Sequence, residues 1–206
     1  MQAVAPAGAV NSLAQTLLKA TSPGVPDLYQ GCEYWDFSLV DPDNRRPVDF
    51  VARRASLSDT ATLDELMESW HDGRIKQTVI ARTLTLRKQV PDLFAKGVYT
   101  PLAVEGTHSE RVLAFARELE GQKVVVVVPR LPAALMTQTD LPHIAAEQWA
   151  DTRIHLPAGV AGWTNILDGV SFKGTPDAMA MGDVLASLPI ALLVSDNIDA
   201  SNEARI

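Results

Sequence analysis

The spacing of apolar side chains predicts three helices in the first part of the chain. Leucines repeat on one face of residues 11–20, and a second stripe begins at Thr62, where Glu65 stands at the spacing of a capping box. A third stripe runs from 72 to 88 and stops before Pro91, a residue that ends helices. The stripes predict core contacts, and the positions that carry them are Leu13, Leu17, Leu18, Leu63, Leu66, Met67, Trp70, Ile75, Val79, Ile80, Leu84 and Leu86.

Later in the chain the apolar pattern changes to that of short strands. Residues 111–118 and 123–129 flank a turn around Gly121 and predict a hairpin. Its second strand holds five consecutive valines, 124–128, so we expect burial on both faces. Several short strands after a helical region predict an α+β chain that ends in an antiparallel β-sandwich. The remaining strand signals are 98–104, a second hairpin turn at Asp168-Gly169, and 190–194.

Aromatic and acidic residues follow the first predicted helix. Pro23 and Gly24 stop that helix, and residues 25–31 then predict a short buried strand. Glu33 and Trp35 come directly after the strand, within a run of acids and aromatic rings. Flat rings stack on the apolar faces of sugars, while carboxylates and amides bond to hydroxyls, so this order suits a sugar site. Taken singly, each ring is better explained as part of the core.

The ten residues from Asp41 to Phe50, DPDNRRPVDF, predict an irregular loop, because Pro42 and Pro47 exclude a helix interior and a central strand. Its three carboxylates and two guanidiniums form either a salt-bridged turn closed on itself or a wall that binds a polar ligand. The glycine and distal glutamate of a calcium loop are missing. The candidate substrate-binding residues are Tyr29, Gln30, Glu33, Trp35, Asp41, Asp43, Asn44, Arg45, Arg46 and Asp49.

Composition narrows the partners of the chain. Its 206 residues carry a formal net charge of -7, which argues against nucleic acid and anionic membrane but suits a neutral oligosaccharide. A single cysteine, Cys32, excludes an internal disulfide and suits a reducing cytoplasm. Neither a membrane-spanning apolar run nor a signal peptide is recognisable. We expect no metal and no cofactor, because a phosphate-binding glycine loop is missing and the histidines lack ligand spacing, namely His71, His108, His143 and His155.

The segment PGVPDLYQGCEYWDFSLVDPDNRRPVDF resembles the region around the last barrel strand of the maltooligosyl trehalose synthase family, in the alpha-amylase clan of glycoside hydrolases. The extension DPDNRRPVD is typical of the trehalose-forming branch. Weaker similarity covers almost the whole chain, through NSLAQTLLKATSPG before the segment and WHDGRIK, RVLAFAR, VVVPRL and LPIALL after it. The positions that match the general clan pattern are Pro23, Gly24, Pro26, Tyr29, Gly31 and Glu33.

This resemblance implies two parts. Residues 1–95 would hold the last strand, active-site loop and helices of an incomplete (β/α)8 barrel, and residues 96–206 an antiparallel β-sandwich. Because such a barrel needs eight strands and this sequence supplies about one, the chain would be the C-terminal portion of the enzyme. Helix faces at Leu13, Leu17 and 63–70 would then be uncovered, which predicts a homo-oligomer or association with the missing barrel portion.

The resemblance also implies an activity. The family converts the reducing-end α-1,4 link of maltooligosaccharides to an α,α-1,1 link by retaining intramolecular transglycosylation. Its nucleophile and acid lie upstream, so we expect no catalytic residue here and no activity of the chain alone. Glu33 would support the site, and the candidate residues would shape the pocket near the reducing-end glucose and exclude water. A non-catalytic carbohydrate-binding or scaffold module is the alternative, and the DPDNRRPVD loop disfavours an amylase or a trehalose-releasing hydrolase.

Overall fold

Helices cover one face of an antiparallel sheet in the computed structural model, which describes residues 4–38, 45–136, 140–174 and 177–198. The middle layer is a six-stranded sheet of order β1-β3-β4-β9-β6-β7, and a three-stranded sheet, β2-β5-β8, packs on its other face. The strands are β1 Val98–Pro101, β2 Val104–Glu105, β3 Val112–Leu119, β4 Gln122–Pro129, β5 Arg153–His155, β6 Gly162–Asn165, β7 Ser171–Lys173, β8 Ala178–Ala180 and β9 Ala191–Ser195.

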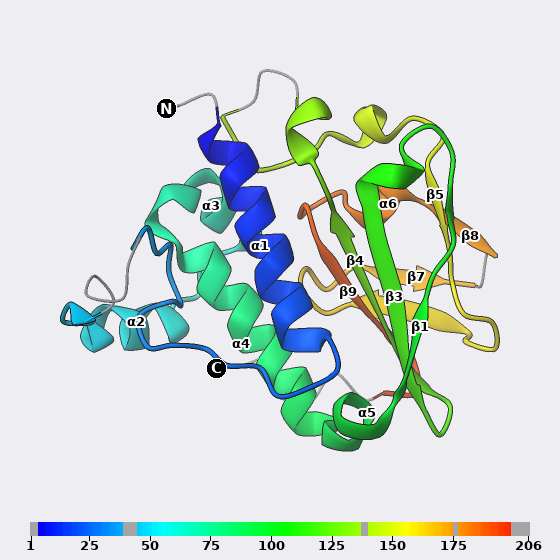
Figure 1. Ribbon diagram of the computed structural model, residues 1–206, viewed down its shortest axis with the longest axis horizontal. Helices are drawn as coiled ribbons and strands as arrows, with labels where there is room; N and C mark the ends of the chain where they lie inside the picture. The colour runs from blue at the N-terminus through cyan, green and yellow to red at the C-terminus, as the bar shows by residue number, and fades with distance from the viewer. Residues whose placement is uncertain (1–3, 39–44, 137–139, 175–176, 199–206) are drawn as a thin grey trace.

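Two long helices, α1 and α4, pack side by side in the same direction and make up most of the helical layer, as Figure 1 shows beside β4 and β9. The α-helices are α1 Ala5–Thr21, α2 Phe50–Leu57, α3 Leu63–Glu68, α4 Arg74–Gln89, α5 Pro91–Lys96 and α6 Met181–Val184. Short 3-10 turns lie at Trp70–Asp72, Ser109–Arg111, Pro132–Ala134 and Ala146–Trp149. The observed architecture is therefore a mixture of helices and antiparallel sheet, as the α+β prediction required.

The valine strand β4 belongs to two hydrophobic clusters at once. Val124, Val126 and Val128 pack with the helices, whereas Val125 and Val127 pack with the three-stranded sheet. None of the five side chains is more than 1% exposed. Successive side chains of a strand point to opposite sides, so a run of valines fits a strand that is covered on both faces. The burial predicted for this strand is confirmed.

The hairpin that joins β3 to β4 also follows its prediction. The two strands pair from Val112 with Pro129 to Leu119 with Gln122, which leaves Glu120 and Gly121 as a two-residue turn. Both turn residues have positive φ, 51° and 81°. A two-residue hairpin turn with both residues in this region matches the right-handed twist of its strands. The second predicted hairpin is present as β6 and β7.

A buried guanidinium ties the helical layer to the sheet. Arg117 in β3 is 1% exposed and donates to the carbonyl oxygens of Thr21 at 3.2 Å, Phe94 at 2.8 Å and Gly97 at 2.9 Å. These carbonyls belong to the C-terminal ends of α1 and α5, where unpaired acceptors and the helix dipole favour a cation. Burial lowers the pKa of Arg117. The side chain thus holds two helix ends against one strand.

The predicted helices are present with shifted limits. The first begins at Ala5, before the predicted start at 11, because Pro6 suits the first turn of a helix. Thr62 and Glu65 form the predicted capping box at the start of α3. The third helix is α4, and Pro91 opens the separate short helix α5. The predicted strand over 98–104 is divided, since β1 and β2 pair in different sheets.

The predicted buried strand over 25–31 is wrong. Residues 22–38 are irregular, and Val25 is 94% exposed. A strand needs a neighbouring strand for its backbone hydrogen bonds, and none of the described strands pairs with this segment. The prediction also missed helix α2, which has no buried residue and therefore lacks the apolar stripe that marks a helix in sequence.

The helix faces that were expected to be uncovered are buried within the chain. Leu13 and Leu17 are fully buried, and Leu66, Met67 and Trp70 are 5 to 6% exposed. They join the cluster that packs on the six-stranded sheet. The physical argument for oligomerisation therefore fails, because these residues already have partners in the same chain. Oligomerisation itself stays a prediction.

Candidate functional site

The irregular segment 22–38 is held against α2 by one arginine. Arg53 in α2 donates through Nε to Glu33 Oε2 at 2.8 Å and through Nη2 to the Gly31 carbonyl at 2.8 Å. Its Nη1 donates to the Asp49 carbonyl at 3.1 Å, and its guanidinium lies 4.6 Å from the centre of the Tyr34 ring. Gly31 and Asp49 flank residues 32–48, which include most of the candidate residues and which we call the candidate loop. We call this set of contacts the Arg53 clasp, because it joins the two ends of the loop.

A chain of hydroxyl and amide groups extends the Arg53 clasp to α4. The Tyr34 hydroxyl lies 2.6 Å from Ser56 Oγ and 3.3 Å from the Ala52 carbonyl. Ser56 Oγ lies 2.5 Å from Gln77 Oε1, and Gln77 Nε2 donates to the Arg53 carbonyl at 3.0 Å. Gln77 is 4% exposed, so its amide needs these partners. The contacts fix α2, which has no buried side chain of its own, to α4.

Trp35 anchors the same segment to the turn before α4. Its Nε1 donates to the Trp70 carbonyl at 2.6 Å, and the two indole rings meet edge to face with centroids 6.2 Å apart. Gly73 in this turn has φ 83°, and a Cβ there would lie 2.9 Å from the Trp35 nitrogen and from Tyr34 Cβ. Glycine is therefore required at this position both by its conformation and by the close approach of the backbone. His71-Asp72-Gly73-Arg74 thus form a tight turn that leads directly into α4.

The carboxylates of this region have defined structural partners. Glu33 pairs with Arg53, and Asp49 Oδ1 accepts from the Ala52 amide as the N-cap of α2. Asp36 accepts from the Ser38 hydroxyl at 2.6 Å and the Ser38 amide at 2.9 Å, and these hydrogen bonds lower the pKa of Asp36. All three carboxylates therefore already have a hydrogen-bond partner within the chain, either a backbone amide or a side chain.

Two further titratable groups, Lys76 and Cys32, belong to the contact between segment 22–38 and α4. Lys76 in α4 donates to the Tyr34 carbonyl at 3.0 Å, and burial lowers its pKa. Burial, with the nearby Asp36 carboxylate, raises the pKa of the Cys32 thiol. Both shifts favour the uncharged forms, which is the expected effect of a partly desolvated environment.

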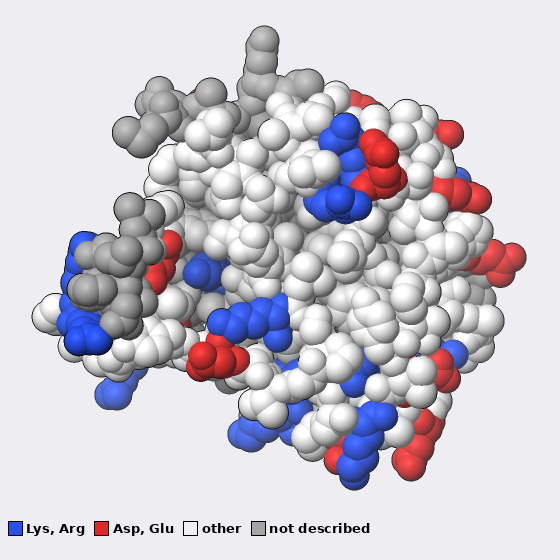
Figure 2. All heavy atoms as spheres, viewed as in Figure 1, with Lys and Arg blue, Asp and Glu red and all other residues white. Residues whose placement is uncertain are grey.

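The structure brings together only some of the ten candidate residues. Glu33 and Trp35 lie in the contacts with α2 and α4, and Asp49 caps α2, whereas Tyr29 and Gln30 are exposed. Their roles toward a substrate stay predictions. Arg45 and Arg46 are also exposed, and Figure 2 shows basic side chains beside the grey atoms at the left edge, where α2 lies in Figure 1. Three candidates lie outside the described residues, namely Asp41, Asp43 and Asn44.

Sequence reasoning missed the residues that organise the site. Arg53, Ser56 and Lys76 form hydrogen bonds with residues 31–34, but they lie 20 to 42 positions further along the chain. Gln77 joins them through Ser56 and the Arg53 carbonyl. The one local signal for their arrangement was Asp49, a residue type that favours the N-cap of a helix. Asp49 could have indicated the start of α2, but it could not have shown that α2 packs against residues 31–34 and α4.

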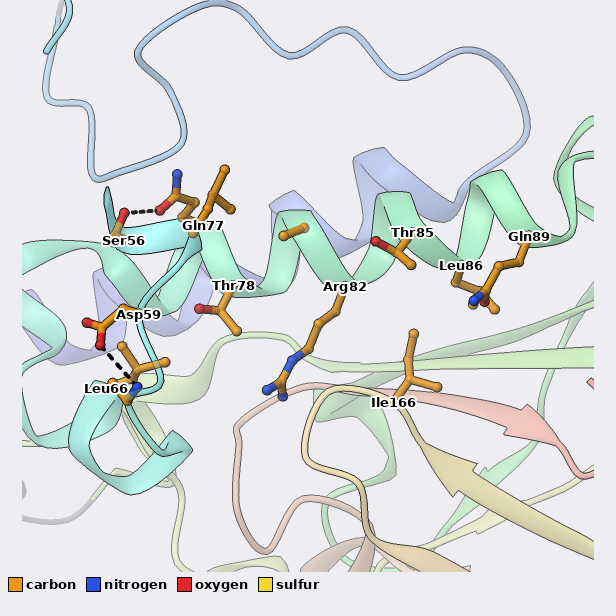
Figure 3. Close-up of a pocket in the computed structure, with 13 residues that line it drawn as sticks. Ser56, Asp59, Leu66, Gln77, Thr78, Arg82, Thr85, Leu86, Gln89 and Ile166 are labelled. Atoms are coloured by element: carbon orange, nitrogen blue, oxygen red, sulfur yellow. Dashed lines mark hydrogen bonds between the residues drawn. The ribbon is translucent and has the colours of Figure 1, made fainter. Parts of the chain in front are cut away.

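A cavity of about 150 Å³ lies on the other side of the same α2–α4 contact. Ser56 and Gln77 of the network line it, together with Arg82 and residues further along α4. Figure 3 shows Thr78, Arg82 and Thr85 on α4 with Ile166 across the cavity. In the described part of the chain, no group of three or more histidine, cysteine, aspartate or glutamate side chains could hold a metal ion. Nor does any described helix have the length and apolar character needed to cross a bilayer.

Solved structures place this fold in a known class. It matches a noncanonic maltogenic alpha-amylase from Thermotoga neapolitana over 90% of this chain and 36% of that chain, with a TM-score of 0.51 and 11% identity. The likeness shows that the chain shares its fold with a part of an alpha-amylase-like protein. No family model matches the sequence.

More specific likenesses point to maltooligosyl trehalose synthase. Two proteins of that provisional name, from two strains of Mycobacterium tuberculosis, are 39% identical over 187 residues, which is 91% of this chain and 21% of theirs. A mutant of maltooligosyltrehalose synthase from Arthrobacter ramosus matches with a TM-score of 0.71 and 36% identity, over 92% of this chain and 22% of that one. Another solved maltooligosyl trehalose synthase gives a TM-score of 0.66 and 30% identity over the same shares.

The predicted resemblance to maltooligosyl trehalose synthase is therefore confirmed in sequence and in structure. The chain spans about a fifth of the length of the curated relatives that it matches. That share agrees with the expectation of a C-terminal portion.

Proposed function

We propose that this chain is the C-terminal part of an isomerase that forms maltooligosyl trehalose. The intact enzyme would convert the reducing-end α-1,4 link of a maltooligosaccharide to an α,α-1,1 link by retaining intramolecular transglycosylation. The observation that carries this proposal is the similarity to maltooligosyl trehalose synthases over nine tenths of the chain. The substrate would be the maltooligosaccharide that gives those relatives their name.

We assign this chain the task of shaping the reducing-end sugar site. The Arg53 clasp supports this role, because it joins Gly31 and Asp49 at the two ends of the candidate loop. A loop with fixed ends holds its side chains in place at a lower entropic cost on binding. The nucleophile and acid would come from the missing upstream part. In agreement with that division, Glu33, Asp36 and Asp49 are already engaged in structural contacts.

The same proposal divides the chain into two structural parts. Residues 1–95 would complete a (β/α)8 barrel whose other strands come from upstream, and residues 96–206 would form the β-sandwich domain. Segment 25–31, which pairs with none of the described strands, would then lie against the upstream part. The high exposure of Val25 and Phe37, 94% and 86%, supports a surface that another part of the enzyme covers.

The test is complementation. The purified chain is incubated with maltopentaose, with and without a separately expressed upstream barrel portion, and non-reducing product is measured. We expect product only from the mixture. Product from the chain alone would contradict the assignment of the catalytic carboxylates to the upstream part. If neither sample forms product although the two portions bind each other, a non-catalytic carbohydrate-binding or scaffold module is the better description.

The proposal also predicts an effect of Arg45 on product choice. In the intact enzyme, Arg45→Ala should raise the proportion of free glucose relative to trehalose ends, because a loosened pocket admits water to the glycosyl-enzyme intermediate. Both products are quantified from one reaction by chromatography. A product ratio equal to that of the unchanged enzyme would refute a role of Arg45 in water exclusion.

A further inference from the structure

The cavity beside α4 has walls from three distant parts of the chain. Its long side is α4, the residues between α2 and α3 cross one end, and Ile166 of the turn between β6 and β7 faces α4 across the opening. The volume of about 150 Å³ equals that of an engineered cavity known to hold one six-membered ring. A ligand of that size is a single ring rather than a peptide or a nucleotide.

Hydrogen-bonding groups lie along the α4 wall. Arg82 is half-buried, and its Nη1 donates to the Leu167 carbonyl, which is its hydrogen-bond partner among the described residues. Nε and Nη2 of Arg82 are thus left for a ligand. Thr78 Oγ1 donates to the Arg74 carbonyl at 3.1 Å, so its lone pairs can accept, and the Thr85 hydroxyl stands about two helical turns beyond. Figure 3 shows the Arg82 side chain extending from the helix into the cavity.

The charges around the cavity balance one another. The Asp168 carboxylate lies close enough to Arg82 to favour its charged form, although burial lowers the pKa of Arg82. Asp59 at the other end is paired with Arg74 at 2.6 Å. An anionic ligand would have to compete with Asp168 for Arg82, and a cationic ligand would meet Arg82 itself. The balance therefore favours an uncharged ligand that offers hydroxyl groups.

Apolar side chains complete the lining. Leu66 and Leu86 are buried at the base, and Ala81 and Ile166 add aliphatic surface. A small ring with one apolar face and a rim of hydroxyls matches this combination of aliphatic base and donor-bearing wall. We infer that the cavity binds one neutral hexose unit, and that the unit is a terminal glucose of a maltooligosaccharide. The choice of glucose rests on the proposed function, whereas the choice of an uncharged ring rests on the cavity alone.

We expect weak binding at this site. The lining residues include no aromatic ring that could stack on the sugar, so hydrogen bonds must supply most of the affinity. A dissociation constant of about 1 mM corresponds to roughly 4 kcal/mol, which a few such bonds can provide. Such a site would hold a glucan chain near the enzyme without competing with the reducing-end site for it.

The experiment is a titration of the purified, isotope-labelled chain with maltose, followed through its backbone amide resonances. We expect saturable shifts at Thr78, Arg82 and Ile166. Inorganic phosphate is titrated in parallel and should give no saturable shift there. Shifts that saturate with phosphate instead would overturn the hexose assignment, and so would the absence of saturable maltose shifts at these residues.

Two variants locate the ligand. Thr85→Trp should fill the cavity and Arg82→Met should remove its donors, and each should weaken maltose binding at least tenfold. Lys88→Met, an exposed change on the same helix, should leave the affinity unchanged. The resonances of β4 show whether each variant keeps its fold. Maltose affinity that survives Thr85→Trp in a folded protein would refute the site.

The same spectra separate this inference from the proposed function. Shifts at residues 29–35 report on the reducing-end site, and shifts at 78–85 report on the cavity. Loop shifts without cavity shifts would overturn the cavity site alone and leave the proposed function standing. Cavity shifts without loop shifts would support the hexose site and count against sugar binding by the loop in this chain.

Discussion

Removing the Arg53 side chain should release the candidate loop without unfolding the protein. Arg53→Met keeps the length of the side chain but loses the bonds to Glu33, Gly31 and Asp49 and the contact with the Tyr34 ring. The guanidinium and its partner carboxylate are 17% and 30% exposed, so solvent screens part of their attraction. Allowing for that screening, we expect the loss to destabilise the local structure by about 2 kcal/mol.

The effect should stay local, because α2 has no buried side chain. Hydrogen exchange measured by mass spectrometry is the assay. Peptides from 29–38 and 50–57 should exchange about thirtyfold faster in Arg53→Met than in the unchanged chain, since each 1.4 kcal/mol corresponds to roughly a factor of ten. Peptides from the buried strand β4 should keep their rates.

Arg54→Met serves as the control, because it changes a neighbouring exposed arginine of α2. It should leave both regions at their original exchange rates. Unchanged exchange over 29–38 in Arg53→Met would show that the clasp does not hold the loop. Equal acceleration in β4 would show a loss of global stability, which would also refute the reasoning.

The other predictions concern stability. Arg117→Met removes three short bonds to helix-end carbonyls and should cost about 3 kcal/mol, lowering Tm by about 6 to 12 °C; an unchanged Tm would contradict the proposed coupling of the layers. Gly73→Ala should destabilise by about 3 kcal/mol in urea unfolding, whereas Gly8→Ala, where no atom lies within 4 Å of the added Cβ, should not destabilise; equal effects would refute the close approach. The pKa of Lys76 lies below its ordinary 10.5 in the folded state, so the unfolded chain binds more protons between the two values. The unfolding free energy of the unchanged chain should therefore rise relative to Lys76→Met as pH is raised to 10.5, and Lys88→Met should show no such trend.

Elements defined by neighbouring residues were predicted well from the sequence. The capping box of α3 involves Thr62 and Glu65, three positions apart, and the hairpin between β3 and β4 turns at Gly121. In each case the residues that decide the conformation contact one another directly along the chain. The valine strand was recognisable for a similar reason, because only a strand covered on both faces accommodates such a run.

Errors arose where the decisive partner is distant or missing. Residues 25–31 have the apolar character of a strand, yet no described strand lies beside them to accept their backbone hydrogen bonds. Helix α2 has no apolar stripe, and contacts with residues 31–34 and with α4 hold it in place. The apolar pattern of one segment does not reveal whether a neighbouring strand will pair with it or whether distant residues will hold it in place.

In the candidate site, too, local features could be predicted from the sequence and long-range contacts could not. The sequence alone indicated the family through the segment 23–50 and indicated which residue types could meet a sugar. It determined the local elements as well, because propensity, capping and alternation act over a few positions. Only the tertiary structure decided that Arg53 joins the two ends of the loop, that Arg117 reaches helix ends up to 96 positions away, and that Arg82 faces a cavity closed by Ile166. These contacts depend on how the helices pack on the sheet, and packing is a property of the whole chain rather than of any segment.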